Sequence, residues 1–147
     1  MEPCIAVACD GAGYSLKMEM IAFLNGKGCT VVDFGADSAA SCDYPDFAET
    51  ACKAVLDGRC GCALLFCGTG VGMSIAANKM NGIRACCCTD IFSAEMTRLH
   101  NDANVLCLGA RVVAAGLAEK LVDSFLTTEF DGGERHQRRI DKISALE

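Results

Sequence analysis

The chain has 147 residues, of which 52% are hydrophobic and 22% charged, and its formal net charge is −6. A chain of this size and apolar content can bury one hydrophobic core, which predicts a single domain over residues 1–147 and excludes a disordered chain. The acidic balance argues against a nucleic-acid partner, because nucleic-acid binders present a net basic face.

No stretch of the sequence predicts export or membrane insertion. No apolar run reaches the roughly 18–20 residues that span a bilayer. The start Met1-Glu2-Pro3 has no basic segment before its short apolar stretch, unlike a signal peptide. We therefore expect a cytoplasmic protein with no membrane partner. The 12 cysteines are then expected to be reduced thiols used as small buried side chains.

Apolar runs alternate with amphipathic stretches along the whole chain. Strands are predicted at residues 4–9, 30–34, 62–66, 83–88 and 105–108, and helices at 14–27, 46–56, 73–79, 91–100, 116–130 and 134–146. The strands are nearly continuous apolar runs, as burial on both faces requires. This alternation predicts an α/β fold, a single three-layer doubly wound domain with a five-stranded parallel sheet (Rossmann-like) and a C-terminal helix.

Helical spacing also predicts which side chains face the core. In the helix at 91–100, Phe92, Met96 and Leu99 are expected to point inward. In the last helix, His136 lies among basic residues and is expected to be solvated.

Doubly wound sheets bind ligands beyond the carboxyl ends of their strands. That edge contains Asp10 after the first strand, the turn at residues 67–72 after the third, and Arg111 after the fifth. The turn, with the sequence CGTGVG, precedes a helix, so its N–H groups form a ready anion site. It is neither a Walker loop nor a complete dinucleotide fingerprint. A tight strand-to-helix turn without a ligand is the alternative interpretation.

Cys67 stands directly before this turn, beside the start of a helix. A helix N-terminus lowers the pKa of a thiol, so a thiolate there could act as a base while neighbouring N–H groups stabilise an oxyanion. No metal site is predicted, because CxxC is absent and Cys60 and Cys62 are too close in sequence for a zinc site.

Three further residues are candidates for binding or catalysis. His100 ends a predicted helix, where a surface histidine favoured by the helix dipole is the alternative. Arg135 and Arg139 are four residues apart and therefore share a helix face. Their guanidinium groups could hold a phosphate, and a solvated helix face is the alternative.

Over these residues the sequence resembles the type B ribose-5-phosphate isomerases, a family that also includes galactose-6-phosphate and allose-6-phosphate isomerases. The similarity runs from Ile5 to about Ile143 and is carried by residues 43–46, 67–79, 82–85, 100–105 and 109–111 and by the Arg135/Arg139 pair. The resemblance implies a cofactor-independent and metal-independent aldose–ketose isomerase of a phosphorylated sugar in carbohydrate metabolism. The substrate it favours is ribose 5-phosphate, converted to ribulose 5-phosphate.

The resemblance also implies a role for each candidate residue. Cys67 would take the proton from the substrate carbon and His100 would open the sugar ring. The main chain of Gly68, Thr69, Gly70, Val71 and Gly72 would hold the enediolate oxygen, with Thr69 assisting. Asp10 and Asn101 would contact sugar hydroxyls, and Arg111, Arg135 and Arg139 would hold the phosphate. One branch of the family has a glutamate base six residues after Cys67; Met73 stands there, which favours the cysteine branch.

One departure from the family pattern falls in this set. The family usually has a substrate-contacting histidine directly after the first-strand aspartate, and Gly11 stands there. A neutral replacement compensated by water and an altered substrate preference both fit this change. Isomerisation of a galactose, allose or tetrose phosphate therefore stays open, as does a non-catalytic sugar-phosphate-binding protein. A thiol redox protein is disfavoured because Cys67 has no CxxC partner.

The predicted topology separates two of the candidate residues. A helix that leaves the carboxyl edge of the fourth strand runs back to the opposite edge, so His100 at its end should lie far from Cys67 of the same chain. We therefore expect His100 and Asn101 to serve the active site of a partner chain in a homodimer. Whether such dimers pair into tetramers is left open.

Overall fold

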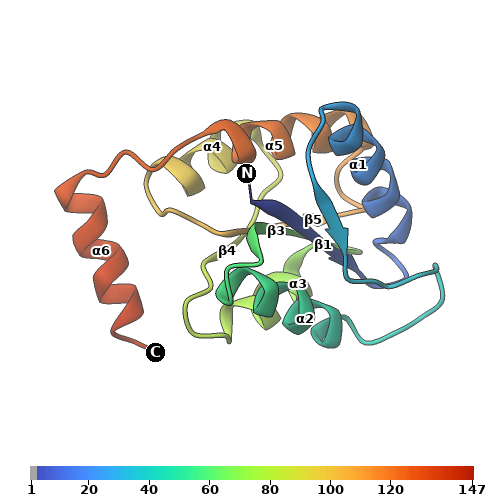
Figure 1. Cartoon of the computed structure of the whole chain (residues 1–147), viewed down its shortest axis with the longest axis horizontal. Coiled ribbons are helices and arrows are strands. Elements are labelled where there is room, and N and C mark those ends of the chain that lie inside the picture. Colours follow the sequence, from blue (N-terminus) through green and yellow to red (C-terminus); the bar gives the residue numbers. More distant parts are fainter. Residues whose placement is uncertain (1–2) are drawn as a thin grey trace.

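The computed structural model describes residues 3–147 and contains one parallel β-sheet (Figure 1). Its strands are β1 (Cys4–Cys9), β2 (Val31–Asp33), β3 (Cys60–Cys67), β4 (Ala85–Cys87) and β5 (Val105–Gly109), in the spatial order β2-β1-β3-β5-β4. The five predicted strands are confirmed, with ends that shift by at most two residues. The first two residues, on which part of the expectation of no export signal rests, lie outside the described residues.

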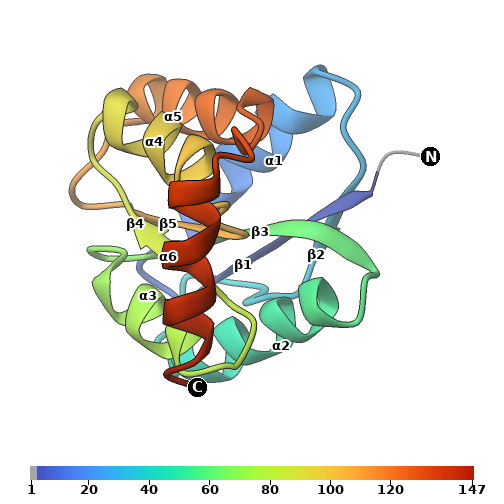
Figure 2. The ribbon, with the colours of Figure 1, turned by 90° about the vertical axis from the view of Figure 1, so that its left-hand side faces the viewer.

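Helices cover both faces of this sheet. One face packs against α1 (Tyr14–Gly26), α4 (Ile91–Leu99) and α5 (Ala115–Thr127), and the other against α2 (Tyr44–Leu56) and α3 (Val71–Asn78). The sixth helix, α6 (Glu134–Ser144), lies at the left of Figure 1 and passes in front of the sheet in Figure 2. The predicted three-layer fold is confirmed. Within residues 3–147, no helix has the length and apolar character to cross a membrane.

The central strands contribute to two separate cores. Leu64 and Phe66 of β3 face the layer of α1, α4 and α5, whereas Leu65 and Cys67 face α2 and α3. All four side chains are at most 4% exposed. Because both faces of the strand are covered, an uninterrupted apolar run is required there.

The order of the strands places a crevice at the end of β1. From β2 the chain passes over α2 and returns on the other side of β1, so that α1 and α2 lie on opposite faces. At such a switch point, the loops that follow the two central strands diverge and leave room for a ligand. Here the two strands are β1 and β3, which end at Cys9 and Cys67. The ends of β1 and β3 therefore lie side by side at the carboxyl edge of the sheet, where a ligand site is predicted.

The expectation that all cysteines are reduced is wrong for one pair. Cys4 and Cys60 form a disulfide between the starts of β1 and β3, with their Cα atoms 4.6 Å apart. They are register partners on neighbouring strands, a relation that a separation of 56 residues conceals in the sequence. The other ten cysteines are free. Burial raises the pKa of Cys52 to about 12, so this thiol serves as a small apolar side chain.

The predicted inner face of α4 is also wrong in part. Phe92 is 70% exposed, and Met96 and Leu99 are only half-buried. The buried positions are Ala94 and Thr97, which are three residues apart on the face toward α5. Close packing of α4 against α5 therefore uses small side chains and leaves the largest one outside.

One buried charge was not predicted at all. Lys17 of α1 is completely buried, and its ammonium donates to Oδ1 of Asp33 at 2.8 Å and to the carbonyl of Ala36 at 2.6 Å. An ion pair of this kind ties the segment after β2 to α1. A buried ammonium without a counter-charge is costly. The main contribution of Asp33 to stability is therefore to neutralise the charge of Lys17.

Asp33→Ala should lower the free energy of unfolding by about 2 kcal/mol, because it leaves the Lys17 ammonium buried and unpaired. The expected cost is moderate because the Asp33 side chain is 36% exposed and water can replace part of it. Adding Lys17→Met to this variant removes the unpaired charge and should recover stability. Urea unfolding of the single and double variants measures both effects. A double variant less stable than Asp33→Ala would contradict this account.

Candidate active site

The turn at residues 67–72 is fixed by its contact with β5. Gly70 caps α3 in a left-handed conformation, with φ of 80°, which glycine adopts without strain. A Cβ atom at Gly109 would lie 2.6 Å from the carbonyl oxygen of Thr69, so the two backbones touch where β5 ends. Glycine is therefore required on both sides of this contact, and the turn is held by main chain rather than by side chains.

Cys67 lies at the carboxyl end of β3, as predicted. Its Sγ accepts a hydrogen bond from the N–H of Gly70 at 3.1 Å, and its carbonyl accepts from the N–H of Ala110 at 2.9 Å. The residue is 4% exposed. The thiol is thus buried at the end of its strand, where it contacts a backbone donor of the turn.

The start of α3 supplies further N–H groups beside the thiol. The N–H of Val71 donates to Oγ1 of Thr69 at 3.3 Å, which orders the exposed Thr69 side chain. Gly72 and Met73 follow in the first helical turn, whose N–H groups have no acceptor within the helix. The helix dipole adds partial positive charge at the same point. This end of α3 therefore favours a negatively charged group.

A cavity of about 280 Å³ opens at the same edge of the sheet, lined by Asp10, Gly11, Ala12, Ala39, Ser41, Cys42 and Arg111. Asp10 is oriented by the N–H of Gly13, which donates to its Oδ1 at 3.0 Å. The Arg111 side chain extends toward Gly68, where a Cβ atom would lie 3.5 Å from Nη1. Three predicted residues, Asp10, Gly11 and Arg111, are thus brought together, while Cys67 is not among the residues that line this cavity.

The structure gives a physical reason for glycine at position 11. A Cβ atom there would lie 2.4 Å from the carbonyl oxygen of Ala40 and 2.6 Å from that of Ala39. The loop after β2 therefore occupies the space that any side chain at Gly11 would need. Histidine, which the resemblance led us to expect, does not fit unless this loop moves.

The arginines fall into two groups. Arg59, Arg84 and Arg98 each lie within 3.5 Å of an aspartate, and Arg84 and Arg98 also donate to backbone carbonyls. Within residues 3–147, no ion pair is formed by the other four arginines, which are Arg111, Arg135, Arg138 and Arg139. Arginines that are exposed and unpaired on an acidic protein are the ones free to take an anionic ligand.

His100, Asn101, Arg135 and Arg139 form a second group, away from Cys67. His100 caps the end of α4, and Arg135 and Arg139 lie on α6. The chain enters β5 at Val105 soon after His100, whereas Cys67 is paired with Gly109 at the other end of that strand. Four residues of strand span roughly 13 Å. In Figure 1, α6 lies at the opposite end of the molecule from the tip of β1.

Two residues of this second group were missed, and the expectation for one was wrong. His136 is 8% exposed rather than solvated, and its ring centroid lies 4.2 Å from that of His100. Its Nδ1 lies 2.8 Å from Oδ2 of Asp131. Residues 131–133, with the sequence Asp-Gly-Gly, turn the chain so that Asp131 contacts the first turn of α6. Helical spacing in the sequence does not reveal this contact.

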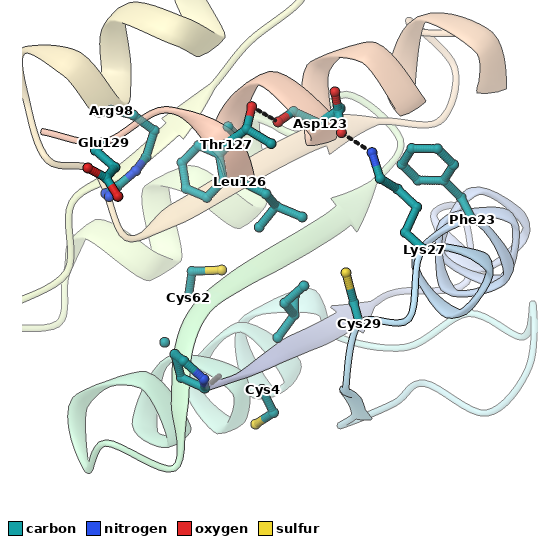
Figure 3. Close-up of a pocket in the computed structure, with 14 residues that line it drawn as sticks. Cys4, Phe23, Lys27, Cys29, Cys62, Arg98, Asp123, Leu126, Thr127 and Glu129 are labelled. Carbon is teal, nitrogen blue, oxygen red and sulfur yellow. Dashed lines mark hydrogen bonds and ion pairs between the residues drawn. The ribbon is translucent and has the colours of Figure 1, made fainter. Parts of the chain in front are cut away.

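A separate cavity of about 580 Å³ lies at the amino edge of the sheet, beside Cys62 and Cys29 (Figure 3). Its two cationic groups already have partners, because Lys27 pairs with Asp123 and the Arg98 guanidinium donates to the carbonyl of Ala103. Burial raises the pKa of Cys62 to about 11, so its thiol stays protonated. This cavity lacks the unpaired donors found at the carboxyl edge.

Known proteins resemble this chain over nearly its whole length. The family model described as ribose/galactose isomerase matches residues 5–143. Ribose-5-phosphate isomerase B of Escherichia coli is 47% identical over 97% of this chain and 95% of that protein. D-erythrulose-4-phosphate isomerase of Pectobacterium atrosepticum is 44% identical over 97% and 94%, respectively. The solved structure of Clostridium thermocellum ribose-5-phosphate isomerase B has a TM-score of 0.95 at 48% identity and covers 97% of this chain and 95% of its own.

Fold and sequence together define an aldose–ketose isomerase that acts on phosphorylated sugars. Within this class, the chain belongs to the ribose/galactose isomerase family, and its relatives confirm the type B resemblance seen in the sequence. The predicted family, fold and class of reaction are thus confirmed. The particular sugar and the role of each residue stay predictions.

Gly11→Ala should displace the loop that carries Ala39 and Ala40, because the new Cβ would meet both carbonyl oxygens. We expect a lower melting temperature and a raised KM for the sugar phosphate. Gly26→Ala is the matched control, since a Cβ at Gly26 meets nothing within 4 Å. That change should be neutral or stabilising by about 0.5 kcal/mol. Equal melting temperatures for the two variants would refute the proposed loop contact.

Proposed function

We propose that this protein interconverts ribose 5-phosphate and ribulose 5-phosphate, with Cys67 as the base. The observation that carries the proposal is the placement of the Cys67 thiol against the Gly70 N–H, next to the start of α3. A proton must move between two neighbouring carbons, so base and oxyanion donors have to lie side by side. Such a proton transfer needs no cofactor, and a cytoplasmic location stays our expectation.

The chemistry divides between the thiol and the turn. In the open-chain aldose, the Cys67 thiolate takes the proton from carbon two, and the electrons move onto the carbonyl oxygen to give an enediolate. N–H groups of residues 68–72 stabilise this oxyanion, with Thr69 assisting. The same thiol then returns the proton to carbon one, while the proton of the carbon-two hydroxyl passes to the carbon-one oxygen, which forms the ketose.

The remaining residues divide between sugar and phosphate. Asp10 and Asn101 would bind sugar hydroxyls, beside the backbone at Gly11. His100 would open the ring, by taking the anomeric hydroxyl proton and giving a proton to the ring oxygen. Arg111, Arg135 and Arg139 would hold the phosphate, which their lack of internal ion pairs supports. A phosphate far from the reacting carbons anchors the substrate for each step.

We propose that two chains share each site in a homodimer. The second group, with His100, Asn101 and the α6 arginines, would complete the site of the partner chain. Exposed apolar side chains near the carboxyl edge support such an interface. They are Val71, Ile75, Ile91, Phe92 and Val112, each 41–70% exposed.

A four-carbon sugar phosphate is the second candidate substrate. The carbonyls of Ala39 and Ala40 occupy the space next to Gly11, which lines the cavity, and this favours a shorter substrate. The similarity to an erythrulose-4-phosphate isomerase points the same way. Galactose or allose 6-phosphate would need more room at this end. Comparing kcat/KM over aldose and ketose phosphates of four to six carbons separates these substrates, and a binding protein without activity would turn over none of them.

Cys67→Ala should reduce kcat by about 10²–10⁴-fold, the usual contribution of a general base. In deuterated water, the wild type should incorporate deuterium at carbon two of the aldose. In the variant, this incorporation should be slower by the same factor as kcat. Cys87→Ala is the matched control, because the exposed Cys87 thiol contacts the Thr69 carbonyl at 3.5 Å without a place in the mechanism. Deuterium uptake by Cys67→Ala at the wild-type rate would exclude Cys67 as the base.

Subunit exchange tests the shared site. Cys67→Ala and His100→Ala homodimers should each be nearly inactive. A hybrid dimer has one site with both defects and one with neither, so an equal mixture should recover about a quarter of the wild-type activity when pairing is random. Native mass spectrometry measures the hybrid fraction. Activity that stays at the level of the parent variants, although hybrids form, would mean that each site belongs to one chain.

A further inference from the structure

Two imidazoles and one carboxylate converge beside the start of α6. His100 caps α4, Asp131 lies in the connection between α5 and α6, and His136 is in the first turn of α6. One ligand atom from each lies within 4.8 Å of the other two. The proposed isomerisation makes no use of Asp131 or His136, so their convergence on His100 needs a separate explanation.

The carboxylate of this cluster is held by the main chain. Oδ1 of Asp131 accepts from the N–H of Gly133 at 2.7 Å, and Oδ2 lies 2.8 Å from Nδ1 of His136. The N–H of Asp131 donates to the carbonyl of Leu99 at 3.1 Å, which ties the segment to the end of α4. The Gly133 hydrogen bond is also the main reason that the pKa of Asp131 is lowered, so the carboxylate is ionised. One oxygen is therefore anchored while the other faces the imidazoles.

The imidazoles are constrained as well. The His136 side chain is 10% exposed, and its ring centroid lies 4.2 Å from that of His100 with a tilt of 37° between the planes. A zinc-type ion binds nitrogen and oxygen ligands at about 2.0–2.2 Å, which needs ligand atoms roughly 3–3.5 Å apart. The three ligand atoms, which lie within 4.8 Å of one another, are thus close to the spacing that one ion requires.

We propose that His100, Asp131 and His136 bind a divalent transition-metal ion of the zinc type. Two imidazoles and one carboxylate suit such an ion and leave a position for water, whereas magnesium and calcium prefer oxygen ligands. The bound ion is an inhibitor and not a cofactor, because it occupies the imidazole that opens the sugar ring. This inhibition rests on the proposed function; the binding itself does not.

Cobalt absorption tests the binding without any use of activity. Co²⁺ is added to the full-length protein, and visible d–d bands should appear without the intense near-ultraviolet band of thiolate ligands. That distinction matters because ten free cysteines are the competing ligands. His136→Gln and Asp131→Asn should each weaken Co²⁺ binding about tenfold or more. Glu134→Gln is the matched control, an acidic side chain at the same helix start that should bind like the wild type.

Circular dichroism and melting temperatures establish that the variants are folded. With two different variants, the test can still be made if one of them fails to fold. An intense thiolate band would overturn the proposal. So would a Co²⁺ affinity that is the same in the wild type, His136→Gln and Asp131→Asn.

Zinc inhibition is measured separately, with each variant compared to its own metal-free rate. Zn²⁺ should slow the wild type, EDTA should restore the rate, and His136→Gln should keep its rate at the same Zn²⁺ concentration. Equal inhibition of His136→Gln and wild type would overturn the inhibitory role. A chain that binds Co²⁺ as expected but isomerises no sugar phosphate would instead refute the proposed function and leave the metal site standing.

Discussion

The contact between the turn at 67–72 and the end of β5 is the constraint on which the rest of the site depends. Gly109 allows the Thr69 carbonyl to lie against the β5 backbone, and the Ala110 N–H holds the carbonyl of Cys67. These main-chain contacts place the Gly70 N–H at the Cys67 sulfur. Rigid backbone is well suited to this task, because donors that are already oriented need no rearrangement when charge develops. In the mechanism that we propose, the sheet therefore supplies both the base and the surroundings of the oxyanion.

The direction of the strands then divides the functional groups between two edges. Parallel strands bring Asp10, Cys67 and Arg111 to the carboxyl edge, and each following helix carries the chain back. His100 can only reach the amino edge in such a fold, since it ends α4. One chain thus presents Cys67 with one arginine at one end, and His100 with two arginines at the other. In the homodimer that we propose, each end is completed by the opposite end of a second copy.

The sequence predicts the parts of this structure that follow from local pattern and fails where tertiary contacts decide. The β3 run and the glycine turn after Cys67 are readable because burial on both faces and a helix start leave direct marks in the sequence. Lys17 is different, because its charge is buried for partners, Asp33 and Ala36, that lie 16 and 19 residues further on. Phe92 fits a helical stripe as well as Ala94 does, and only the approach of α5 selects the smaller residue. His136 is surrounded by basic residues in the sequence but by Asp131 and His100 in space.

Helix α6 buries only His136 and Ile140, and Arg135 and Arg139 stand one position before them. Adjacent positions on an α-helix are separated by about 100° around its axis. The two anchors therefore set the rotation of the helix, and with it the direction in which both guanidinium groups project. The start of the helix is held as well, because Asp131 in the connection before α6 lies against His136. A residue inserted between His136 and Arg139 would put the two anchors out of register by about 100°, so that one guanidinium group would turn away from its present direction. Selection should therefore preserve the spacing inside this helix more strictly than the amino acids around it.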